Sequence, residues 1–135
     1  MTNWLAGMRV TAGRLNNHDP VDLTSTVTAA TGFSLSVFDA RKAAGVVEFN
    51  VTLIRSGASL AAADSAGNMI DVVCATMPTD CLPAGRWTGA FEKSGQASGG
   101  VRIEANGVVT LVSMDPTSQI TSGATINFSG AFATG

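Results

Sequence analysis

Apolar and polar side chains alternate along most of the chain after Pro20, as expected for strands with one buried face. In residues 46–57 four apolar side chains recur at every second position and are predicted to point inward: Val47, Phe49, Val51 and Leu53. Residues 33–40 alternate in the same way, and the predicted inner face carries Phe33, Leu35 and Val37. The charged stretch 41–45 ends in glycine, so we predict a hairpin in which these five residues connect the two strands.

A second hairpin is predicted over residues 101–114, where two alternating runs flank Asn106-Gly107. Asn-Gly is the preferred dipeptide of a two-residue type I′ turn, because both positions need positive φ. Other strands are predicted over residues 22–32 (an edge strand), 69–77, 86–94 and 124–134. Roughly seven or eight strands at short spacing predict an all-β fold, an antiparallel β-sandwich or jelly-roll-like domain over residues 21–135.

Residues 1–20 do not follow this two-residue period. Four of their apolar side chains lie near helical spacing: Trp4, Leu5, Met8 and Leu15. The stretch from Asn17 to Pro20 is a stop signal, because turn-forming residues precede a proline. We predict a short N-terminal helix or an extended arm. So short a segment is not stable alone in water, so we expect its apolar side chains to dock on its own domain, on a sister subunit or on another protein.

Charged residues make up only 13% of the 135 residues, about half the usual share for a soluble domain. The formal net charge is −2, so no basic surface indicates nucleic-acid binding. The mean hydropathy is +0.27. Together with the low charge, it predicts surface that is hidden in an oligomer or a larger particle.

Met1–Val10 lacks the cationic start and the long apolar run of a signal peptide. No stretch reaches the ~18 apolar residues of a membrane helix. We therefore expect the protein to fold in a cytoplasm, without membrane insertion.

The chain carries no recognisable catalytic motif. Its single histidine, His18, lies beside Asp19 in a predicted turn, where adjacent side chains point in different directions and do not make a catalytic dyad. Its ten acidic residues are scattered singly along predicted strands and turns. We predict that the protein is not an enzyme and that it uses no cofactor.

Cys74 and Cys81 lie seven positions apart. A disulfide between them is geometrically possible, whereas a cytoplasmic origin favours two free thiols. No metal site is predicted, because two thiols without a further cysteine pair or a nearby histidine fall short of four ligands. Arg86 and Trp87 are a candidate ligand surface for sugar stacking or a cation–π contact, and core packing of the indole is the alternative.

The opening NWLAGMRVTAGRLN resembles the start of small tail-associated proteins of phages that infect actinobacteria. Those proteins often begin with a Trp–Val/Leu–Ala–Gly phrase followed by TAxRLN, which residues 4–7 and 11–16 match. Two later stretches resemble the same proteins: GNMIDVVCATMPTDCLPAG, with its LPxGxxP-like end, and GGVRIEANGVVTLVSM, with a GxVxIxxxGxVxL hairpin. After LPAG, Arg86-Trp87-Thr88 replaces the family's aromatic–Arg–Pro, so no role of that proline is carried over.

The resemblance implies a virion structural protein, a minor tail or tail-fibre component that is commonly a homotrimer. It implies an N-terminal segment that attaches to other virion proteins, and a β-sandwich that packs about a threefold axis and presents loops outward. A host cell-surface glycan is a candidate partner of these loops. The expected location is the virion, after assembly in the host cytoplasm. Two alternatives stay open: a capsid decoration protein, which would use the arm as a clasp on the head, and a carbohydrate-binding module built around Trp87 or exposed loops.

Overall fold

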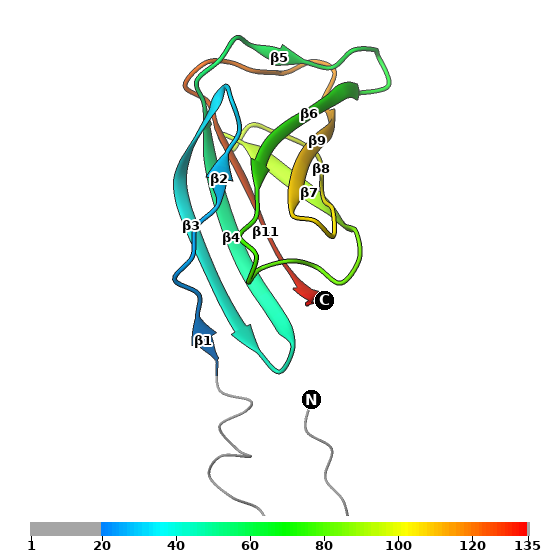
Figure 1. The fold of residues 1–135 in the computed structure, drawn as a ribbon. Helices are drawn as coiled ribbons and strands as arrows, with labels where there is room; N and C mark the ends of the chain where they lie inside the picture. Colours follow the sequence, from blue (N-terminus) through cyan, green and yellow to red (C-terminus); the bar gives the residue numbers. More distant parts are fainter. Residues whose placement is uncertain (1–19, 135) are drawn as a thin grey trace, which may run out of the picture.

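The computed structural model describes residues 20–134, and the predicted arm with Trp4, Leu5, Met8 and Leu15 lies outside the described residues. The described chain is all-β and antiparallel, which confirms the predicted fold class (Figure 1). Its strands are β1 (Val21–Asp22), β2 (Thr28–Ala29), β3 (Phe33–Ala43), β4 (Val46–Arg55), β5 (Leu60–Ala61), β6 (Asn68–Thr76), β7 (Trp87–Lys93), β8 (Ala97–Ile103), β9 (Val108–Met114), β10 (Gln119–Ile120) and β11 (Thr125–Ala133). No helix that is long and apolar enough to span a membrane occurs among residues 20–134.

Nine of the strands form one curled sheet in the order β1-β3-β4-β11-β7-β8-β9-β6-β2 (Figure 1). β2 closes the curl. It pairs with the end of β6, and it also lies beside β3, to which it is connected by a turn at Gly32. β7, β8 and β9 form a meander, and β6 lies beside β9, which is the strand order of a Greek key. The remaining pair, β5 and β10, crosses one end of the curl, where Ile120 is fully buried.

The hydrophobic core lies inside the curl, and alternate side chains of each long strand point into it. On β4 the four positions predicted to face inward have exposed fractions between 0% and 2%, which confirms the prediction: Val47, Phe49, Val51 and Leu53. The strands around them contribute matching rows: Phe91, Val101, Ile103, Val109, Leu111, Ile126 and Phe128. Each large apolar side chain that is removed from water contributes about 1.5–3 kcal/mol, so these rows dominate the stability of the fold.

β3 contains a bulge that the sequence pattern did not reveal. The pairing register with β4 shifts between Leu35 and Val37, so Ser36 is an extra residue on β3. After the bulge the even-numbered residues of β3 point inward, whereas the sequence pattern predicted the odd-numbered ones. Phe38 and Ala40 therefore lie on the inner face. Val37, which was predicted to face inward, is instead 40% exposed. That prediction was wrong.

The turn of the first hairpin is shorter than predicted. Residues 41–43 continue β3, and only Ala44 and Gly45 form the connection. Both take positive φ, 51° and 78°, as a type I′ turn requires. The sequence did not predict this turn, because alanine rarely adopts that conformation.

The turn of the second hairpin also differs from the prediction. Four residues, 104–107, connect β8 and β9, and Gly107 N donates a hydrogen bond to Glu104 O at 2.8 Å. Gly107 alone has positive φ, so this is a type I turn with a glycine bulge rather than the predicted type I′ turn. Met77 N donates to Gly107 O at 2.8 Å, and this tertiary contact holds the longer turn against a neighbouring loop.

The edge strand predicted over residues 22–32 is not continuous. The structure has only the two-residue strands β1 and β2 in this region, with irregular chain between them.

Arg55, at the end of β4, holds one end of the fold together. Its side chain is almost buried, with 9% exposed, and its guanidinium lies 4.7 Å from the centre of the Phe33 ring. Arg55 Nε donates a hydrogen bond to Ala58 O at 2.9 Å, and Nη1 donates to Gly32 O at 3.2 Å. Gly32 leaves room for this group, because a Cβ there would lie 2.7 Å from Nη1. The guanidinium therefore fixes the turn between β2 and β3 against the loop after β4.

We expect Arg55→Met to lower the free energy of unfolding by about 1.5–3 kcal/mol, because Ala58 O and Gly32 O lose hydrogen bonds from a charged donor that is itself almost buried. Denaturant titration followed by circular dichroism measures this change. The matched control is Arg41→Met: Arg41 pairs with Asp22 at 2.9 Å on the surface, where a lost ion pair costs roughly 0–1 kcal/mol. Equal effects of the two substitutions would contradict the assigned role of Arg55.

Candidate functional site

In the structure Arg86 and Trp87 contact different partners and do not form the predicted common ligand surface. The indole of Trp87 packs edge to face on Phe49, with ring centres 5.1 Å apart. It also covers Gly130, where a Cβ would lie 2.7 Å from Trp87 Cζ2. Only part of the ring is exposed, and it borders a small hollow of about 240 Å³ between the 83–86 segment and the end of β11. The indole therefore serves mainly as core, and its exposed rim is what a ligand could reach.

Arg86 points to a different partner. Its Nε lies 3.0 Å from Glu104 Oε2, and Glu104 Oε1 lies 3.1 Å from Arg102 Nε without hydrogen-bond geometry. Arg102 also forms an ion pair with Asp71, with Nη2 2.7 Å from Oδ2. Four alternating charges thus run across β8 toward β6. This series engages Arg86 with a carboxylate, which makes it less available for stacking on the indole.

Two carboxyl groups have perturbed pKa values for structural reasons. Hydrogen bonds from the side chain and backbone of Asn68 lower the pKa of Asp64. Hydrogen bonds from the backbone and hydroxyl of Thr117 lower the pKa of Asp115. Both carboxylates brace surface turns as acceptors, which is a common use of aspartate. Among residues 20–134, no three His, Cys, Asp or Glu side chains come together in a group that could hold a metal ion.

Cys74 and Cys81 are both free and buried. Burial raises the pKa of Cys74 to about 12, and its Sγ lies 3.6 Å from Val109 O, which accepts a weak hydrogen bond. Burial, reinforced by the charge of Asp80, raises the pKa of Cys81 to about 11. Thiolate is the nucleophilic form, so both groups are packing residues with little reactivity near neutral pH.

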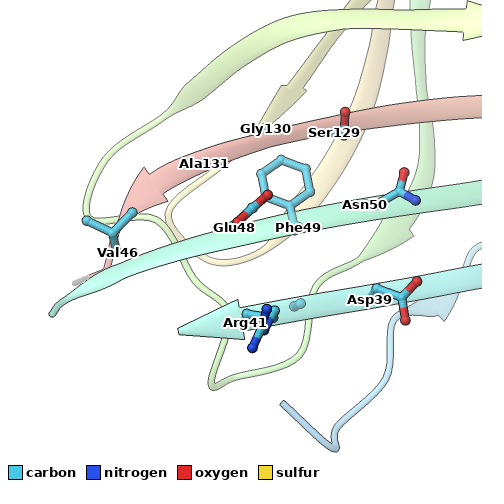
Figure 2. Close-up of a pocket in the computed structure, with 10 residues that line it drawn as sticks. Asp39, Arg41, Val46, Glu48, Phe49, Asn50, Ser129, Gly130 and Ala131 are labelled. Atoms are coloured by element: carbon cyan, nitrogen blue, oxygen red, sulfur yellow. The ribbon is translucent and has the colours of Figure 1, made fainter. Parts of the chain in front are cut away.

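A shallow groove crosses the outward face of β3, β4 and β11 (Figure 2). It has a volume of about 740 Å³, and its outward-pointing lining residues are Asp39, Arg41, Val46, Glu48, Asn50, Ser129 and Ala131. The short side chains of residues 129–131 on β11 leave space above that strand, and the longer side chains of β3 and β4 border this space. The groove combines carboxylates with exposed apolar surface at Val46, which is 46% exposed. Such a lining suits an apolar segment that carries positive charge.

The second candidate surface is the free edge of β6. β2 pairs only with Ala75 and Thr76, so within the described chain the edge from Met69 to Val73 has a strand, β9, on one side only. Ile70 is 81% exposed and Val73 is 47% exposed along this edge. An open strand edge with apolar side chains readily pairs with another chain. The sequence did not reveal it, because apolar residues at 69, 70, 72 and 73 fit either face and a register shift between 68 and 72 displaces them.

We expect neither cysteine to react readily with a maleimide at pH 8 in the folded protein, because both are buried and roughly one Cys74 thiol in ten thousand and one Cys81 thiol in a thousand is ionised at pKa values of about 12 and about 11. Both should react after unfolding in guanidinium chloride, as counted by mass spectrometry. Rapid labelling of the folded chain would contradict the buried positions. Failure to label either thiol after unfolding would indicate a disulfide instead of free thiols.

The described residues thus offer two surfaces for contact with other molecules, the groove on β3, β4 and β11 and the free edge of β6. The first is a mainly apolar lining with the carboxylates of Asp39 and Glu48 beside it, and the second is a row of unpaired backbone groups with Ile70 and Val73 beside it. Both suit recognition of a polypeptide. No family model matches the chain, and no curated protein matches it either.

Proposed function

We propose that this chain is a non-enzymatic structural subunit of a phage virion, a tail or tail-fibre component that assembles as a homotrimer. In this proposal residues 1–20 fasten the subunit to other virion proteins, and its loops face the host surface. The observation that carries the proposal is the opening phrase at residues 4–16, which resembles the start of tail-associated phage proteins and directly precedes an all-β domain.

The surfaces of the domain support an assembly role. The edge of β6 offers unpaired N–H and C=O groups together with Ile70, whose side chain is 81% exposed. A contact between this edge and a different face of the next subunit is heterologous, and heterologous contacts form a ring such as a trimer when the rotation between subunits closes. The low charge of the chain fits the same role, because surface that is covered in a particle needs few charges for solubility.

Immunogold electron microscopy of particles made from the genome that encodes this chain tests the proposal. Antibodies against the full chain are expected to label tails. Labelling of heads would overturn the tail assignment and support a capsid decoration protein. The absence of the chain from purified particles, measured by mass spectrometry, would overturn the virion proposal altogether.

Self-association has its own test at Ile70. We expect Ile70→Lys to shift the mass of the full chain from about three times 13.7 kDa toward the monomer in light scattering, because a lysine on the edge blocks strand pairing. Substitution of so exposed a residue should change the free energy of unfolding by no more than about 0.5 kcal/mol.

Val37→Lys is the matched control, since Val37 is also an exposed apolar residue and lies on β3 instead of β6. This variant is expected to keep the oligomeric mass. A monomeric parent chain, or an unchanged oligomeric mass in Ile70→Lys, would contradict the role of this edge.

A further inference from the structure

The groove on β3, β4 and β11 begins at the point where the chain enters the fold. A smaller hollow of about 160 Å³ is lined by Pro20, Arg41, Ala43, Val46 and Glu48. Arg41, Val46 and Glu48 also line the main groove, so the two hollows adjoin each other. Pro20 therefore lies at the mouth of a groove that leads along the outward face of the sheet.

Residues 1–19 join the fold at this mouth. β1 follows directly after Pro20 and is fixed by pairing with Arg41 and Lys42 of β3. The residues immediately before Pro20 are Asn16, Asn17, His18 and Asp19, which favour a chain reversal. A reversal there would return the preceding segment toward the groove. The covalent tie gives that segment a high effective concentration at the groove compared with any separate partner.

The chemistry of the segment complements the groove. Asp39 and Glu48 form no ion pair among residues 20–134, whereas the guanidinium of Arg41 is held by Asp22 at 2.9 Å. Residues 1–19 contain two arginines, Arg9 and Arg14, against one acidic residue. The segment can therefore supply positively charged partners for the carboxylates of Asp39 and Glu48 in the groove.

The apolar part of the groove also has a counterpart in the segment. Val46 is 46% exposed, and Ala131 on the neighbouring strand β11 is exposed as well. Trp4, Leu5 and Met8 are large apolar side chains of the segment, and so short a segment cannot bury them by itself. A volume of about 740 Å³ lies within the roughly 300–1,000 Å³ of sites that enclose a compact ligand, so it has room for two or three such side chains.

We propose that the groove on β3, β4 and β11 is the docking site of residues 2–15 of the same chain. The basic side chains of the segment face Asp39 and Glu48, and its apolar side chains cover Val46 and Ala131. This inference concerns the chain before it is incorporated into a particle, and attachment of the segment to other virion proteins, as in the proposed function, would release it from the groove. It does not depend on that function, because the contact lies within one chain.

The test measures how fast a groove residue reacts with a maleimide in the full-length protein. Ser129→Cys places a thiol in the groove, while the native thiols are buried and form little background. With the native segment we expect labelling about tenfold slower than in the same variant that also carries Trp4→Ala, Leu5→Ala and Met8→Ala. Asp39→Asn with Glu48→Gln should remove part of this protection, and added salt should do so as well.

Thr88→Cys is the matched control, because Thr88 is exposed on β7 and does not line the groove. Its labelling rate should be the same with the native and the substituted segment. Equal rates at Ser129→Cys with both segments would overturn the proposal. Protection that disappears on about a hundredfold dilution would also overturn it, since the segment would then come from a second copy.

Discussion

The constraint on which the rest of the structure depends is the strict alternation of side chains along β4. Its inward row is completely buried, and both of its edges are paired over nearly the whole strand, with β3 on one side and β11 on the other. A slip of one residue would turn every apolar side chain of this row toward solvent, so the register of all three strands is fixed together. The same alternation decides what faces outward. Asp39, Glu48, Asn50 and Ser129 share one surface because Ala40, Phe49 and Phe128 share the other.

Alternation made the strands predictable from sequence, and the failures occurred where a single residue interrupts it. Ser36 adds a residue to β3 and reverses the phase after it, which no local pattern of serine and valine indicates. Ala44 adopts positive φ because the strands on either side are long and firmly paired, so tertiary structure overrides its local preference. Gly107 forms a longer turn than Asn-Gly alone predicts, because a distant loop at Met77 bonds to it.

The candidate surfaces were harder to predict, because each is made by residues that are distant in sequence. Trp87 becomes a core residue through Phe49 and Gly130, which only the folded sheet brings beside it. The groove needs small residues on β11 next to charged ones on β3 and β4, and the free edge of β6 exists because β2 stops after two residues. The strands follow from local alternation of side chains, whereas these surfaces follow from strand order. Their common feature is that they suit contact with polypeptide.

A map of the assembled particle by cryo-electron microscopy, at a resolution that shows side chains, tests the proposed function most directly. It is predicted to contain three copies of the curled sheet around a threefold axis in the tail, with the edge of β6 against the neighbouring subunit. A particle whose tail is fully accounted for by other proteins would contradict the account. So would a map in which Ile70 of every copy faces solvent.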